Sequence, residues 1–82
     1  MNKEDILIKI RKAFSSVLEH ENFQLTDQTT AEDVDGWESV THMMIINEIE
    51  TKFEIKFELM DLMSLENIGD LIKAIQSKTD NK

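Results

Sequence analysis

Apolar residues recur at helical spacing in three segments of the chain. In the first segment they lie three or four positions apart, which predicts one apolar stripe along a helix from about Asn2 to about Glu19. In the last segment a similar stripe begins after Asn67, whose side chain can accept a hydrogen bond from the Asp70 amide and so cap a helix. The two stripes consist of Ile6, Leu7, Ile10, Phe14, Val17 and Leu18, and of Ile68, Leu71, Ile72 and Ile75.

A middle helix, predicted from Ser39 to about Phe53, carries apolar residues on two faces. At about 100° per residue, one broad face collects core-type side chains, and Val40 and Met44 fall on the opposite face. The second pair is therefore left for solvent or for another molecule to cover. A further short helix of one or two turns is predicted from Leu59 to Met63. One side of the middle helix carries Met43, Ile46, Ile49, Glu50 and Phe53, and Ile45 falls with Ile46, Ile49 and Phe53 in one broad arc.

Residues 20–38 show no helical periodicity and are predicted to form a loop. A loop of about twenty residues inside a small domain is usually either disordered or functional. Four large apolar side chains favour a packed loop that closes the open end of a helical bundle, namely Phe23, Leu25, Val34 and Trp37. The predicted fold class is an all-α four-helix bundle, with three main helices, one short helix and a long first loop. It forms a single domain over residues 1–82, with a frayed tail from Thr79 to Lys82.

Charge restricts the partners that this domain can have. The chain of 82 residues holds 9 Lys and Arg against 17 Asp and Glu, which gives a formal net charge of −8. Such a surface disfavours nucleic acid and anionic membranes, since both need basic patches, and it fits basic protein partners. No apolar run approaches the roughly 20 residues that cross a bilayer, and the first residues lack a signal-peptide core. We therefore expect a cytoplasmic monomer.

Several common kinds of site are missing from the sequence. The run of residues 33–36 resembles the start of a calcium loop, but with Gly36 at its sixth position the loop would begin at Ala31 and end at His42, so principal ligands are absent. With no Cys, and no carboxylates at zinc-motif spacing, His20 and His42 are expected to be surface groups and not metal ligands.

Catalysis is not expected either. A hydrolytic triad needs a concave scaffold that excludes water, and so small a helical bundle offers little concave surface. A phosphate-binding loop needs several glycines at fixed spacing, but the chain has only Gly36 and Gly69. The sequence therefore favours a binding or carrier protein over an enzyme.

The segment Gly36-Trp37-Glu38-Ser39-Val40 is the strongest candidate site. A serine between an acidic loop and a helix is commonly a simple N-cap. Ser39 differs from the other serines because Gly36 permits a tight approach just ahead of it. A phosphodiester on its hydroxyl would also lie at the positive end of a helix, near free amides. Both interpretations stay open on the residues alone: an N-cap, or the attachment point of a phosphorylated prosthetic group.

At these residues the chain resembles an acyl carrier protein. That family modifies a serine in a Gly-x-Asp-Ser-Leu signature that follows a long loop and opens the second helix, and Gly36 to Val40 occupy this pattern. The resemblance covers nearly the whole chain, because the order and spacing of all four predicted helices also match. It implies that Ser39 attaches 4′-phosphopantetheine and that the chain carries an acyl, aminoacyl or polyketide-type thioester without being an enzyme.

The resemblance also implies partners. These are a phosphopantetheinyl transferase and the enzymes that load and transfer the acyl group, all with basic docking surfaces. The residues that would meet them on the middle helix are Glu38, Val40, Met44 and Glu48. Glu38 replaces the usual Asp and Val40 the usual Leu, while Met44 and Asn47 make this helix less acidic than in typical fatty-acid carriers. Partner choice should therefore depend more on apolar contact, to which Met adapts well.

A protein of a different functional class would have the same fold. A small acidic interaction module, never modified, could bind one protein partner through Val40 and Met44. An inactive relative of the carriers would share the bundle as well. Both differ from a carrier in one observable, the intact mass of protein made in a cell that contains a phosphopantetheinyl transferase.

Overall fold

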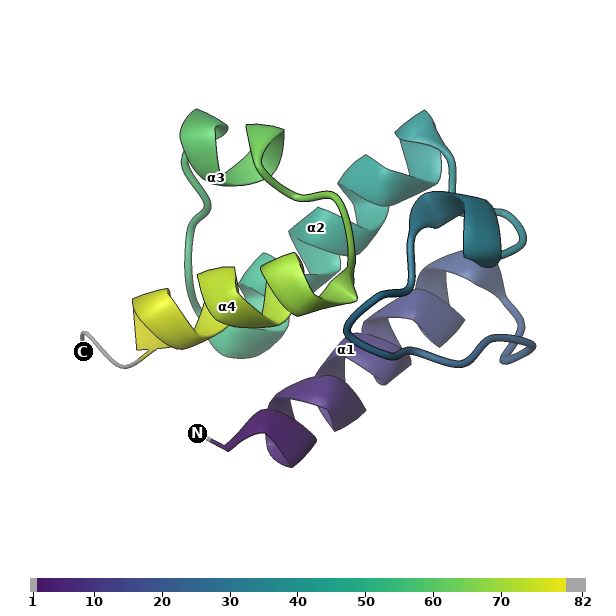
Figure 1. Cartoon of the computed structure of the whole chain (residues 1–82), viewed down its shortest axis with the longest axis horizontal. Helices are drawn as coiled ribbons and strands as arrows, with labels where there is room; N and C mark the ends of the chain where they lie inside the picture. The colour runs from purple at the N-terminus through teal and green to yellow at the C-terminus, as the bar shows by residue number, and fades with distance from the viewer. Residues whose placement is uncertain (1, 80–82) are drawn as a thin grey trace.

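The computed structural model describes residues 2–79 of the chain as an all-helical bundle (Figure 1). The four predicted helices are all present, and the described residues contain no strand. A single 3₁₀ turn interrupts the first loop. The fraying predicted from Thr79 onward does not include Thr79, which is the last residue of α4, and residues 80–82 lie outside the described residues. The elements are α1 (Lys3–Leu18), η1 (Ala31–Asp33), α2 (Ser39–Phe53), α3 (Leu59–Met63) and α4 (Ile68–Thr79).

Polar side chains and left-handed residues set the helix ends. Asn2 Oδ1 accepts a hydrogen bond of 2.9 Å from the Asp5 amide and so caps α1. At the other end of α1, the C-cap residue Glu19 is left-handed, with φ 61°. Asn67 Oδ1 accepts from the Asp70 amide at 2.8 Å, as the sequence predicts. These side chains satisfy amides that have no partner within their own helix.

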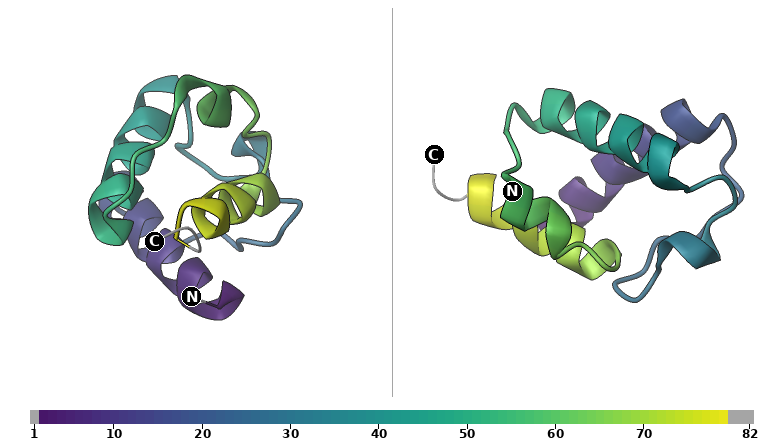
Figure 2. Two further views of the ribbon diagram at one scale, coloured as in Figure 1. Left: turned by 90° about the vertical axis from the view of Figure 1, so that its left-hand side faces the viewer. Right: turned by 90° about the horizontal axis from the view of Figure 1, so that it is seen from above.

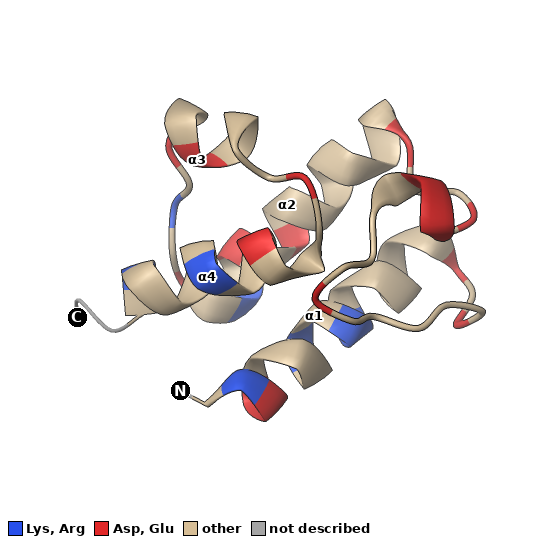
Figure 3. Ribbon diagram, in the orientation of Figure 1, with Lys and Arg blue, Asp and Glu red and all other residues tan. Residues whose placement is uncertain are grey.

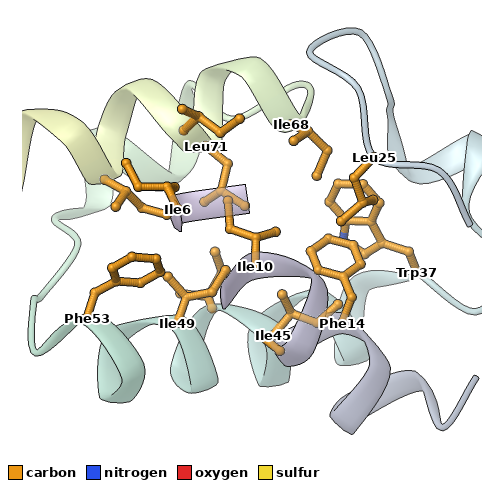
Figure 4. Close-up of a cluster of buried hydrophobic side chains, with 14 of the residues drawn as sticks. Ile6, Ile10, Phe14, Leu25, Trp37, Ile45, Ile49, Phe53, Ile68 and Leu71 are labelled. Atoms are coloured by element: carbon orange, nitrogen blue, oxygen red, sulfur yellow. The ribbon is translucent and has the colours of Figure 1, made fainter. Parts of the chain in front are cut away.

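Seventeen buried apolar side chains form one continuous core between α1, α2, α4 and the first loop (Figure 4). Trp37 and Leu25 lie with Phe14 at one end of this core, and Phe53 lies at the other (Figure 4). The four loop residues predicted to close the bundle are all buried, as are the four predicted core residues of α4 and the Ile and Phe residues of α2. Met43 is an error of the prediction, because it is 54% exposed. It lies about 100° around the helix from the centre of the buried face.

The long loop is fastened to the start of α4 by backbone hydrogen bonds. The Ile68 amide donates to Thr29 O and the Gly69 amide donates to Asp27 O, both at 2.9 Å. These are first-turn amides, which need partners from outside their helix. A Cβ added at Gly69 would lie 2.8 Å from Asp27 O, so only glycine lets the loop approach so closely. The loop is therefore part of the folded bundle.

The short helix α3 lies at the periphery, between two extended connections (Figure 2). Its Asp61 carboxylate accepts from the Glu58 amide at 2.9 Å and pairs with Lys78 of α4 at 3.0 Å. These two contacts lower the pKa of Asp61. Three apolar side chains of α3 are exposed, namely Leu59, Met60 and Met63. Among the residues described, no helix combines the length and the apolar character needed to span a membrane.

Candidate functional site

A glycine turn and a buried tryptophan set the start of α2. Gly36 has a φ of 87°, in the left-handed region that favours glycine. The next side chain, Trp37, is buried and packs edge-on against Phe14, with ring centroids 4.8 Å apart and planes at 80°. The chain then turns outward, so that Glu38 and Ser39 are both exposed. The turn thus places Ser39 at the surface beside a firmly held aromatic ring.

Ser39 is the first residue of α2 and not its N-cap, which is Glu38. The Glu38 amide donates to Thr41 Oγ1 at 2.8 Å, and that hydroxyl donates to Gly36 O at 2.6 Å. Thr41 thus ties the helix start to the glycine turn, and the interpretation of Ser39 as a simple N-cap is wrong. No residue between 2 and 79 forms a hydrogen bond with the Ser39 hydroxyl. The Ser39 hydroxyl is thus exposed and takes no part in holding the described structure together.

An open groove with a volume of about 370 Å³ lies beside Ser39. Its walls come from three parts of the chain: the 3₁₀ turn of the loop, the start of α2, and the connection between α3 and α4. The lining residues are Ala31, Trp37, Glu38, Ser39, His42, Leu65 and Glu66. A group attached to Ser39 therefore has a recess at hand in which its first atoms can lie.

One wall of the groove is an aromatic pair. Trp37 Nε1 donates a hydrogen bond of 2.9 Å to His42 Nδ1, and the two rings are stacked at 5.9 Å with 26° between their planes. A neutral imidazole has one donor and one acceptor nitrogen, so acceptance at Nδ1 leaves the proton on Nε2. Partial burial lowers the pKa of His42, which keeps this ring neutral at pH 7.

His20 holds the other side of the glycine turn. Its Nδ1 accepts from the Asn22 amide at 3.0 Å, and its Nε2 donates to Asp35 O at 2.8 Å. Both histidines are partly exposed, as expected of surface groups, but each is also bonded to the loop that leads to Ser39. Within residues 2–79, no group of three or more His, Asp or Glu side chains could hold a metal ion.

The residues predicted to meet partners fall into two sets. Glu38 lines the groove with Ser39, whereas Val40, Met44 and Glu48 follow one another at one-turn spacing along α2. Val40 is 74% exposed and Met44 50% exposed, as the two-faced pattern predicts, and Glu48 is half-buried. The prediction missed the pairing of Trp37 with His42, although the position of His42 on the buried face of the helical wheel is a usable signal. No local signal indicates Leu65 and Glu66, because only the fold brings them to Ser39.

Charges are segregated along the molecule (Figure 3). Residues 13–51 contain no Lys or Arg, so every basic residue lies in the segments before and after them. The first loop and the start of α2 show acidic residues only, while basic residues are found on α1, on α4 and around the end of α2 (Figure 3). The end of the molecule that carries Ser39 is thus a negative pole.

Comparisons with known proteins agree on one family. The family model described as phosphopantetheine attachment site matches residues 9–75. The acyl carrier protein of Exiguobacterium sibiricum is 30% identical over 78 residues, which are 95% of this chain and 99% of that protein. The non-reducing polyketide synthase pkdA of Emericella nidulans is 36% identical over 72 residues, 87% of this chain but 3% of the synthase. The solution NMR structure of the holo acyl carrier protein from Geobacter metallireducens superposes with a TM-score of 0.85 at 34% identity, covering 93% of this chain and 87% of that one.

Proposed function

The chain belongs to the acyl carrier protein family, and from this premise we propose that Ser39 is the residue to which its 4′-phosphopantetheine is attached. As a member of this family it is a carrier and not a catalyst. When bound, the prosthetic group supplies a thiol that holds the cargo as a thioester. The observation that supports Ser39 most strongly is an exposed hydroxyl, without a hydrogen-bond partner among residues 2–79, at the first position of α2.

The surroundings of Ser39 fit such a group chemically. The first turn of α2 contains no Asp or Glu after the N-cap Glu38, so a phosphodiester on Ser39 lies near the positive end of the helix dipole. The groove beside Ser39 accommodates the first atoms of a flexible arm, and Trp37 gives it one rigid wall. The residues that would hold the arm near its attachment point are therefore Trp37, His42 and Leu65.

Family membership implies that the chain interacts with biosynthetic enzymes. The finer proposal is that a phosphopantetheinyl transferase and the acyl-loading and acyl-transferring enzymes dock on α2 through Glu38, Val40, Met44 and Glu48. The negative pole around Ser39 would steer basic enzyme surfaces toward the arm. A tethered cargo then meets each docked enzyme at high effective concentration, so weak docking is sufficient.

The proposal extends to the state of the molecule. Residues 1–82 act as one carrier domain that works as a cytoplasmic monomer, because its apolar core is complete within one chain and its net charge of −8 opposes self-association. The cargo is an acyl, aminoacyl or polyketide-type group. An unmodified interaction module has the same fold but would take up no prosthetic group.

Loading in vitro tests the attachment site. The protein is incubated with coenzyme A, magnesium and a broad-specificity transferase, and its intact mass is measured. We expect the wild type and the matched control Ser16→Ala, which changes another exposed serine, to gain one phosphopantetheinyl group. Ser39→Ala should gain none. Incorporation into Ser39→Ala, or none into the wild type, would contradict the proposal.

A further inference from the structure

We propose that His42 binds the prosthetic arm at its root, by donating a hydrogen bond from Nε2 to the phosphodiester that joins the arm to Ser39. This inference rests on the proposed attachment at Ser39. It assigns a role to His42 that depends on the hydrogen bond between this residue and Trp37.

The position of His42 on α2 brings its ring toward Ser39. The two residues are three positions apart and are therefore neighbours on the helix surface. Side chains on a helix lean toward its N-terminus, so a residue covers the turn that precedes its own Cα. The turn that His42 covers contains Ser39, and both residues line the same groove.

The hydrogen bond from Trp37 fixes which nitrogen His42 presents to an incoming group. Because His42 Nδ1 accepts from Trp37 Nε1 at 2.9 Å, the neutral ring has its proton on Nε2. Among residues 2–79 none accepts a hydrogen bond from His42 Nε2. His20 differs on this point, since its Nε2 already binds Asp35 O. His42 is thus the histidine with a committed acceptor and an available donor.

The other charged side chains that line the groove do not compete with His42 Nε2 as hydrogen-bond donors. Glu38 from the start of α2 and Glu66 from the connection before α4 line the groove with it, and no Lys or Arg does. Neither carboxylate can donate a hydrogen bond to an anion when ionised. A phosphodiester on Ser39 therefore finds its side-chain donor in His42.

Charge coupling between the two groups gives the inference a measurable consequence. A negative phosphodiester next to the imidazole favours the protonated ring, so the pKa of His42 should be higher in the loaded protein than in the unloaded protein, by about half a pH unit or more. Protonation still has to displace the bond from Trp37 Nε1, because a protonated Nδ1 cannot accept. Trp37→Phe, which keeps a flat ring but removes that donor, should raise the pKa of His42 in both forms.

Nuclear magnetic resonance of the wild-type protein tests this without any variant. The ring signals of His42 and His20 are titrated between about pH 5 and 8 in the unloaded and loaded forms. The pKa of His42 should rise on loading, whereas the ring signals of His20, the internal control, should respond less to loading. The ³¹P signal of the loaded protein should shift with the same midpoint as His42, since a phosphodiester has no ionisation of its own in this range.

Two variants identify the source of the ³¹P shift. The pH-dependent step should be lost in His42→Phe and kept in His20→Phe. A ³¹P signal that does not change with pH in loaded wild type, or an unchanged step in His42→Phe, would overturn the inference and leave attachment at Ser39 intact. A protein that takes up no prosthetic group would overturn the proposed function itself, and this inference with it.

Discussion

Individual residues around the start of α2 decide how Ser39 is presented. Gly36 supplies the left-handed turn, Trp37 anchors that turn in the core, and Thr41 binds the turn to the helix. Because these neighbours satisfy the backbone and fill the core, the serine hydroxyl is free for chemistry. The residue proposed to carry the prosthetic group is thus separate from the residues that hold the structure in place.

Gly36 should be sensitive to substitution through its backbone alone. A Cβ added there would lie 3.5 Å from Leu18 Cδ2, an ordinary contact, so side-chain crowding is not the problem. The strain comes instead from the backbone, because Gly36 has a φ of 87°. We therefore expect Gly36→Ala to lower the free energy of unfolding by about 1 kcal/mol. Chemical denaturation measures this loss. Gly36→Asn is the matched control, because Asn tolerates a left-handed conformation better and should cost less; an equal loss in both variants would contradict the backbone explanation.

His42 should make stability depend on pH in a defined direction. Burial lowers its pKa below the ordinary value of 6.5, so below that value the unfolded chain binds more protons than the folded one. The contribution of His42 is therefore complete above pH 6.5 and is lost as the pH falls toward the lowered value. Denaturation at about pH 7.5 and about pH 5.5 should show a larger acid-induced loss in wild type than in His42→Phe. Equal losses in the two proteins would contradict this assignment.

Sequence patterns single out Ser39, the proposed attachment residue, but not the side chains that support it. Gly36 and Ser39 are predictable because turn chemistry and helix spacing are local properties. The capping role of Thr41 and the bond between Trp37 and His42 depend on how the turn folds onto the helix. A histidine on the apolar side of a helical wheel suggests a partner but does not name it.

At the level of the elements, the two faces of α2 have different tasks. The face with Ile45, Ile46 and Ile49 is buried against the rest of the bundle, and the face with Val40 and Met44 is exposed. Helical periodicity predicts both faces because burial follows the angle around the helix. Met43 lies near the boundary of the faces, where spacing alone does not decide burial.

Substitutions on the two faces should have opposite effects. Met44→Glu changes an exposed residue and should alter stability by no more than about 0.5 kcal/mol. Ile49→Ala empties a fully buried position and should cost about 2 to 5 kcal/mol. Thermal unfolding and transfer assays with partner enzymes separate the two variants.

The variant that changes stability least should impair the partner reactions. Met44→Glu is expected to melt normally and to slow loading or transfer by its partner enzymes. If Met44→Glu unfolds the domain, or leaves every partner reaction at the wild-type rate, the assignment of the docking face is wrong.

At the scale of the whole molecule, contacts distant in sequence complete the site. The loop is held against α4 by bonds from Ile68 and Gly69 to the backbone oxygens of Thr29 and Asp27, and Leu65 lines the groove beside Ser39 from the connection between α3 and α4. The apolar loop residues predict that the loop packs, but not where it packs. Such pairings depend on backbone groups and on topology, neither of which residue spacing encodes.

Concentrated acidic charge should make stability depend on salt. Residues 19–38 contain no Lys or Arg, and like charges closer than the Debye length, about 10 Å at 0.1 M salt, repel one another. Rising sodium chloride should therefore raise the thermal midpoint. Glu32→Gln, which removes one exposed charge, should show a smaller salt effect than wild type. A midpoint that stays constant or falls with salt would argue against repulsion as a destabilising force. The acidic residues of this segment are Glu19, Glu21, Asp27, Glu32, Asp33, Asp35 and Glu38.

The most direct test of the central claim is fragmentation mass spectrometry of wild-type protein made in a cell that contains a phosphopantetheinyl transferase. We expect an intact mass increased by one phosphopantetheinyl group, and fragment ions that place the whole increase on Ser39. An unmodified protein, or an increase located on any other serine, would contradict the assignment of Ser39 as the attachment point.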